Sequence, residues 1–138
     1  ATLRRLGKAV YVVTSGLFQP VAKFAGTLGF APSEVHAVKV HFDVAGAYQG
    51  FEISSPLCRS DGKAIICRRL AEKHGSVAMV GDSVTDLAAR EAGAYVVGYG
   101  GIIDRHVMLQ EADCYISAPL LTATLPALLT EEEESNAT

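Results

Sequence analysis

Short β-rich runs alternate with helical patterns along most of this 138-residue chain, and this alternation constrains its fold more than any other feature. Runs that predict strands occur at residues 9–14, 35–40, 77–80, 94–97 and 114–117. Between them apolar residues recur at helical spacing, and Gly29, Gly75 and Gly93 end three of the predicted helices. Strands that alternate with helices are typical of an α/β fold, in which helices flank a mostly parallel sheet.

Two segments depart from this alternation. Residues 41–53 alternate apolar and polar side chains around Ala45-Gly46, which predicts one antiparallel β-hairpin. From Thr130 the chain is a run of acidic and polar residues, which predicts a solvated, disordered tail. We therefore expect one compact domain over residues 1–129, followed by an acidic tail over residues 130–138.

The composition argues against several classes of protein. The formal net charge of −3 gives no indication of a nucleic-acid partner, and no apolar run is long enough to span a membrane. The odd number of cysteines, at irregular spacing, fits reduced thiols better than a disulfide framework or a zinc site. We therefore expect a cytoplasmic protein without a nucleic-acid or membrane partner.

Two acidic residues follow the predicted strand 77–80. Asp82 comes directly after the strand, and Asp86 lies about one helical turn further on. A carboxylate at the carboxyl end of a parallel strand is well placed to hold Mg²⁺, which uses one or two protein carboxylates together with waters and phosphate oxygens. On spacing alone, the same two residues are equally compatible with a helix cap and a surface acid.

Two further stretches could bind a phosphate group. Ser15 and Gly16 follow the first predicted strand, where a hydroxyl group and a glycine turn could donate hydrogen bonds to an anion. Lys63 lies at the start of a predicted helix, where a cation opposes the helix dipole unless an anion compensates it. A phosphate would be such an anion.

In this order, these residues resemble the motifs of the haloacid dehalogenase superfamily of phosphohydrolases, and among them those of the phosphoserine phosphatases. Val12-Val13-Thr14-Ser15-Gly16 is similar to the second motif of the family, Asp61-Gly62-Lys63 to the third, and the Gly-Asp-x-x-x-Asp of Gly81–Asp86 to the fourth. The resemblance extends from about Thr2 to Leu129.

The resemblance implies a Rossmann-like α/β fold and a phosphatase site. It implies Mg²⁺, or another divalent cation such as Mn²⁺, at Asp82 and Asp86, phosphate binding by Ser15, Gly16 and Lys63, and catalytic roles for Ser15, Lys63, Asp82 and Asp86. It also implies that Arg105 contacts the substrate, although Arg105 could equally pair with Asp104 or Glu111 on the same segment.

One part of the family pattern is missing from this sequence. Family members open with a strand that carries Asp-x-Asp, the nucleophile and the acid/base, and a helical cap domain follows. The sequence contains no Asp-x-Asp, so we expect a fold that is truncated at its N-terminus and lacks the usual first strand and cap. In addition, Val38-Lys39 replaces the Asn-Arg pair that is usual near the phosphoserine site.

Two functions are compatible with this pattern. The first is a magnesium-dependent phosphatase for small phosphomonoesters, in which water replaces the aspartate nucleophile. The alternative is a catalytically inactive relative that binds phosphate or a protein partner, or that needs a separate fragment for activity. A third class, a structural interaction domain, would make no use of the acids.

The missing strand also bears on assembly. It would lie between the predicted strands 9–14 and 77–80, whose backbone groups would otherwise stay unpaired. We expect either that these strands pair directly or that a second chain supplies the pairing by strand exchange, and we favour a homo-oligomer.

Overall fold

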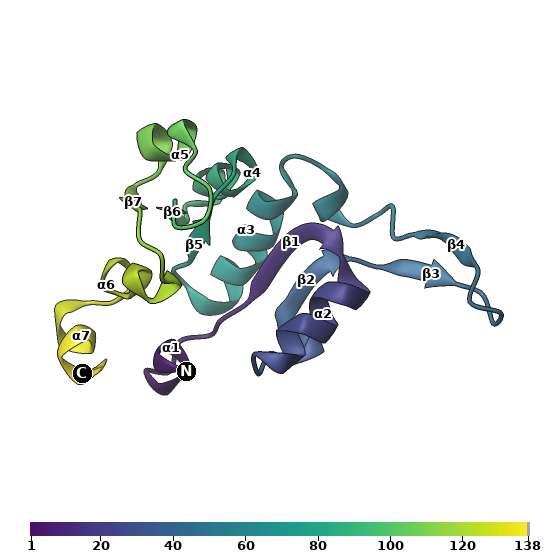
Figure 1. Cartoon of the computed structure of the whole chain (residues 1–138), viewed down its shortest axis with the longest axis horizontal. Coiled ribbons are helices and arrows are strands. Elements are labelled where there is room, and N and C mark those ends of the chain that lie inside the picture. The colour runs from purple at the N-terminus through teal and green to yellow at the C-terminus, as the bar shows by residue number, and fades with distance from the viewer. Residues whose placement is uncertain (138) are drawn as a thin grey trace.

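The computed structural model describes residues 1–137 (Figure 1). Its strands are β1 (Val12–Leu17), β2 (Val35–Val38), β3 (Val40–Phe42), β4 (Tyr48–Phe51), β5 (Ala78–Gly81), β6 (Tyr95–Tyr99) and β7 (Cys114–Ile116). Its α-helices are α1 (Thr2–Arg5), α2 (Phe18–Thr27), α3 (Gly62–His74), α4 (Val84–Leu87), α5 (His106–Glu111), α6 (Leu125–Leu128) and α7 (Glu131–Ala137). Short 3₁₀ turns are η1 (Pro32–Glu34), η2 (Pro56–Cys58), η3 (Ala88–Ala92) and η4 (Leu121–Thr124).

Five of the strands form two parallel sheets with helices on their faces, which confirms the predicted α/β class. β1 pairs in parallel with β2, and β5, β6 and β7 form a parallel sheet in that order. The predicted helix ends are also confirmed, because Gly29, Gly75 and Gly93 follow the ends of their helical segments with φ of 84°, 88° and 76°. Glycine adopts this left-handed conformation without strain.

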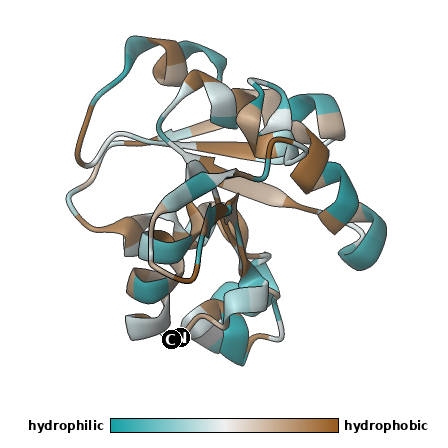
Figure 2. Cartoon of the chain, turned by 90° about the vertical axis from the view of Figure 1, so that its right-hand side faces the viewer, coloured by the Kyte–Doolittle hydropathy of each residue, from teal (hydrophilic) through white to brown (hydrophobic). Residues whose placement is uncertain are grey.

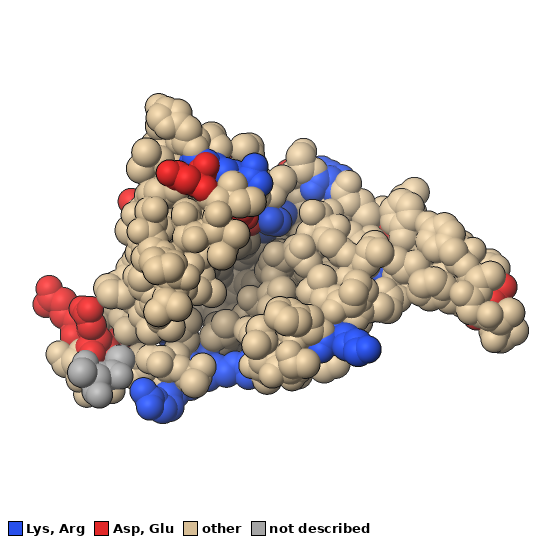
Figure 3. All heavy atoms as spheres, viewed as in Figure 1, with Lys and Arg blue, Asp and Glu red and all other residues tan. Residues whose placement is uncertain are grey.

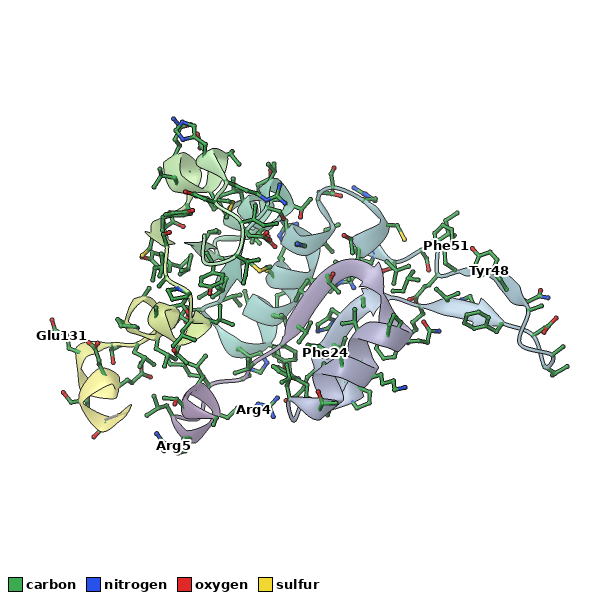
Figure 4. The ribbon with its side chains drawn as sticks, in the orientation of Figure 1. Arg4, Arg5, Phe24, Tyr48, Phe51 and Glu131 are labelled. Atoms are coloured by element: carbon green, nitrogen blue, oxygen red, sulfur yellow. The ribbon has the colours of Figure 1, made fainter. Side chains whose placement is uncertain are left out.

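The predicted hairpin is formed by β3 and β4, which pair antiparallel and extend away from the body of the molecule (Figure 1). The Asp43 carboxylate orders its turn by accepting hydrogen bonds from the backbone N–H groups of Ala45 and Ala47, at 2.9 and 2.8 Å. Tyr48 and Phe51 lie on this projecting arm (Figure 4) and are exposed.

The prediction that the strand at residues 9–14 pairs directly with the strand at residues 77–80 is wrong. Within residues 1–137, β1 pairs only with β2, and β5 pairs only with β6. Side chains join the two sheets instead, since Val13 and Val77 pack against both of the apolar clusters to which α3 contributes. Pairing by a second chain stays a prediction.

Helix α3 connects the two sheets through these clusters. Cys67 belongs to the cluster with Met79, Val96 and Met108, whereas Ile66 and Leu70 belong to the cluster with Val38 and Leu57. On the other face of the β1–β2 sheet, α2 buries Ala25 against Val35 and Ala37. Figure 2 shows the corresponding concentration of apolar residues along the central strands.

The acidic segment after Thr130 differs from the disordered tail that its charge predicts, because residues 131–137 form helix α7. The Thr130 and Glu133 side chains and backbone N–H groups bond one another reciprocally, and the Glu133 carboxylate lies 2.9 Å from Lys8 Nζ. Glutamates in the first turn also favour the helix dipole. They form the red group at the lower left of Figure 3.

No helix within residues 1–137 has both the length and the apolar character needed to cross a bilayer.

Candidate functional site

A buried ion pair joins α3 to α4. Lys63 Nζ lies 2.6 Å from Asp86 Oδ1, and the two side chains are only 13% and 5% exposed. Lys63 is placed by the close packing of the first turn of α3 on η2, since a Cβ atom at Gly62 would lie 2.1 Å from the Pro56 carbonyl oxygen. The structure therefore brings together two residues of separate predicted motifs.

The second oxygen of Asp86 organises the loop that carries Asp82. Oδ2 accepts hydrogen bonds from the backbone N–H groups of Asp82 and Ser83, at 3.1 and 3.0 Å, and from Ser83 Oγ at 2.7 Å. A Cβ atom at Gly81 would lie 2.1 Å from Asp86 Cγ, so this close approach requires glycine. Asp86 is thus a positioning residue for the loop and the lysine.

Asp82 itself faces solvent. Its side chain is 46% exposed, and its Oδ2 atom lies 3.7 Å from Arg105 Nε. Arg105 therefore pairs with Asp82 rather than with Asp104 or Glu111, and the Tyr115 hydroxyl donates a hydrogen bond to Asp104 instead. An exposed ion pair of this length is weak, so either group is free to contact a ligand.

Ser15 and Gly16, which the sequence predicts to bind phosphate, do not join the network of Lys63 and Asp86. Ser15 is exposed, and no hydrogen bond within the described residues joins it to Lys63, Asp82 or Asp86. The Gly16 N–H donates to Thr14 Oγ1 at 3.1 Å, which ties this turn to its own strand. Both residues lie near the carboxyl end of β1.

Sequence reasoning missed Ser83, although a signal was present. Ser83 and Asp86 match the Ser-x-x-Asp spacing of a capping box, and the Asp86 carboxylate accepts a hydrogen bond from the Ser83 backbone N–H at the start of α4. The Ser83 hydroxyl also lies 2.9 Å from Thr85 Oγ1. Ser83 therefore helps to hold the carboxylate network in place.

The donor set fits a divalent cation only in part. Within residues 1–137, no three His, Cys, Asp or Glu side chains come together as a metal site would require. Asp86 is committed to Lys63 and the loop, which leaves Asp82 as the accessible carboxylate. Since Mg²⁺ needs only one or two protein carboxylates when waters and phosphate oxygens complete its shell, Asp82 fits as a single ligand.

Cys67 lies close to this network without taking part in it. Burial, followed by the Asp86 carboxylate, raises the pKa of the Cys67 thiol to about 11, and the Lys63 ammonium opposes this shift. The thiol is therefore protonated near neutral pH. A protonated thiol is a poor nucleophile, so Cys67 is not prepared for nucleophilic attack.

The loop after β6 closes one side of the site. Cβ atoms at Gly100 and Gly101 would lie 1.9 Å from Tyr115 Oη and 2.1 Å from the Ala118 carbonyl oxygen, so both glycines are needed for the close packing of this loop. A pocket of about 140 Å³ lies beside Asp82. It is lined by Val80, Gly81, Asp82, Tyr99, Ile102, Ile103 and Leu121.

Comparison with known sequences agrees with this geometry. The model of the haloacid dehalogenase-like hydrolases matches residues 1–93. A phosphoserine phosphatase of Drosophila melanogaster is 34% identical over 118 residues, which are 83% of this chain and 44% of that protein. The Homo sapiens phosphoserine phosphatase is 29% identical over 110 residues, 78% of this chain and 49% of that protein. The chain spans about half the length of the curated relatives it matches.

Solved structures show the same fold. A phosphoserine phosphohydrolase-like protein from Francisella tularensis has a TM-score of 0.77 over 93% of this chain and 58% of that chain, at 22% identity. A phosphoserine phosphatase described as a phospho-aspartyl intermediate analogue has a TM-score of 0.68 over 91% of this chain and 58% of that chain, also at 22% identity. At this identity the likeness shows the Rossmann-like fold alone.

Proposed function

We propose that this chain, which belongs to the haloacid dehalogenase-like hydrolase family, hydrolyses small phosphomonoesters at Asp82 with the help of Mg²⁺ or Mn²⁺. The observation that supports this most is the buried Lys63–Asp86 ion pair of 2.6 Å, which fixes a cationic side chain near an accessible carboxylate. The phosphatase relatives support the same reaction class.

In this proposal each side chain has a separate task. Lys63 donates hydrogen bonds to a phosphoryl oxygen, and its pairing with Asp86 keeps it oriented. Asp82 holds the divalent cation, which would shield the phosphate charge and activate water when bound. Ser15 donates its hydroxyl hydrogen to a phosphoryl oxygen, the Gly16 N–H exchanges its bond to Thr14 Oγ1 for one to the phosphate, and Arg105 leaves Asp82 to contact the anionic substrate.

The proposed reaction needs no covalent intermediate on the protein. A P–O bond forms to the oxygen of water, and the P–O bond to the alcohol breaks. One proton of that water passes to the departing alcohol oxygen, which leaves inorganic phosphate and the free alcohol. Catalysis of this kind depends mainly on positioning and on stabilising the phosphoryl charge.

A second candidate function is favoured by the separation of β1 from β5. If the site needs a further strand between them, the chain alone would bind phosphate and would hydrolyse esters only when a separate fragment supplies that strand. Both candidates require phosphate binding by Lys63. They differ in whether the isolated chain turns over substrate.

Binding by the two cationic side chains tests the shared part of both candidates. In titration calorimetry with inorganic phosphate and Mg²⁺, we expect Lys63→Ala to weaken phosphate binding about tenfold or more, and Arg105→Ala to weaken it less, because Lys63 is held by a buried partner. Circular dichroism would establish that both variants are folded. Equal losses, or no binding of Mg²⁺ or Mn²⁺ in the presence of phosphate, would contradict this assignment.

A further inference from the structure

The pocket beside Asp82 has an unusual lining for a site that handles phosphate. Apart from Asp82, the side chains around it are apolar or aromatic. Three of them are large and strongly exposed: Ile102 is 84% exposed, Ile103 49% and Leu121 58%. Apolar side chains that gather at the surface next to a charged group mark a binding site more often than isolated exposed ones do.

The fold builds this pocket from three segments. Tyr99 is the last residue of β6, and the close packing of Gly100 and Gly101 turns the following loop so that Ile102 and Ile103 flank Asp82. Leu121, from η4, lines the pocket from a segment after β7. The apolar lining is thus a product of the same loop that brings Arg105 to Asp82.

The pocket is large enough for a small apolar group. Its volume of about 140 Å³ is close to that of a cavity of about 150 Å³ lined by leucine, isoleucine and phenylalanine that binds benzene in another protein. It can therefore hold one phenyl ring or a branched aliphatic group. The charged amino and carboxylate groups of an amino acid would lose hydration there without a polar partner on the walls that Ile102, Ile103 and Leu121 form.

We propose that this pocket binds the apolar group of the substrate's alcohol, so that the site prefers phosphomonoesters of small aromatic or branched aliphatic alcohols. This inference rests on the proposed function, because it places the phosphate between Asp82 and Lys63. The departing alcohol is released from the pocket with its apolar group once the P–O bond has broken. The apolar group and the phosphate belong to one substrate molecule, which explains why apolar walls adjoin Asp82.

Binding of two phosphonates tests the pocket without requiring turnover. Phenylphosphonate carries the ring and methylphosphonate lacks it, and neither has a P–O bond to an alcohol. With Mg²⁺ present, we expect phenylphosphonate to bind at least about tenfold more tightly than methylphosphonate, because the ring leaves water. The methyl NMR signals of Ile102, Ile103 and Leu121 should shift with phenylphosphonate.

A matched pair of variants locates the effect. Ile102→Ser should remove most of the preference for phenylphosphonate, whereas Ile53→Ser should keep it. Ile53 is 81% exposed, which closely matches Ile102, but it does not line the pocket. Since both side chains are exposed, neither substitution should unfold the chain.

Equal affinity for the two phosphonates, or an equal loss in both variants, would overturn the inference, as would failure of phenylphosphonate to bind. The proposed function is judged separately. Ring-dependent binding without hydrolysis of phenyl phosphate would support the pocket and contradict the hydrolase. Hydrolysis of phosphoserine and phenyl phosphate with equal kcat/KM would support the hydrolase and contradict the pocket.

Discussion

At the scale of single residues, Gly81 and Asp86 depend on each other. The Asp86 carboxylate reaches the backbone N–H groups of Asp82 and Ser83 only because position 81 has no side chain. The same carboxylate pairs with Lys63. The geometry of Asp82 and of Lys63 therefore depends on the space that one glycine leaves.

This dependence predicts the effect of Gly81→Ala. The new methyl group would overlap the Asp86 carboxyl carbon, so we expect a loss of about 1–3 kcal/mol in the free energy of unfolding and a larger relative loss of phosphate binding. Gly26→Ala in α2 is the matched control, because nothing lies within 4 Å of a Cβ atom there and alanine favours a helix. Urea denaturation measures the stability of both variants. A Gly81→Ala chain as stable as the wild type would contradict the packing described.

Cys67 predicts a pH dependence of stability at alkaline pH. Its pKa in the folded chain, about 11, lies above its ordinary value of 9.0 because burial disfavours the thiolate. The unfolded chain thus releases the proton first, so the stabilisation is complete below pH 9 and is lost as the pH rises toward 11. The loss should reach roughly 2–3 kcal/mol.

Thermal unfolding between pH 8 and 11 checks this expectation. The fall in Tm should persist in Cys58→Ser, whose thiol is exposed, and should be shallower in Cys67→Ala. Comparison of the slopes removes the constant cost of the Cys67→Ala cavity. Identical slopes in all three proteins would rule out Cys67 as the source.

At the scale of elements, β6 differs from β1 and β5 in its surroundings. β6 has a parallel partner on each side, whereas β1 and β5 each have one partner within the described residues. Amide hydrogens of β6 should therefore exchange with solvent at least tenfold more slowly than those of the open edges of β1 and β5. Hydrogen exchange followed by mass spectrometry measures this. Equal protection of all three strands in dilute protein would contradict the open edges.

Most of the strands and helix ends could be predicted from the sequence. The strand runs were recovered because β-branched residues cluster in buried parallel strands, and the helix ends because Gly29, Gly75 and Gly93 adopt left-handed φ. The expected first strand, 9–14, lies earlier than β1, which continues to Leu17 because its last residues still pair with β2. Local patterns do not report such pairing. Likewise, the acidic charge after Thr130 predicted disorder and gave no indication of the reciprocal Thr130–Glu133 hydrogen bonds of α7.

The site could be predicted less completely than the fold. The resemblance to the family motifs predicted that Asp82 and Asp86 share one site with Lys63 and Ser15, but it could not separate the tasks of the two acids. Burial makes that separation, since Asp86 is 5% exposed and Asp82 46%. The contact of Arg105 with Asp82 depends on the path of a whole loop, which no local spacing encodes.

At the scale of the whole molecule, the open edges of β1 and β5 favour assembly with a second copy of the chain. Unpaired strand edges favour association with another chain, so we expect a homo-oligomer. Multi-angle light scattering should then show a mass that rises with protein concentration, and exchange at β1 and β5 should slow in parallel. A monomer at all concentrations with rapid exchange at both edges would contradict it.

In the proposed function, Asp82 supports hydrolysis of phosphomonoesters with a divalent cation. The most direct test is the rate of phosphate release from p-nitrophenyl phosphate by highly purified protein, with Mg²⁺ and after its removal by a chelator. We expect turnover that requires Mg²⁺, falls at least about 100-fold in Asp82→Asn and is retained in Glu111→Gln, a control acid on α5 outside the site. No turnover by the wild-type chain, or equal rates for wild type and Asp82→Asn, would contradict the claim.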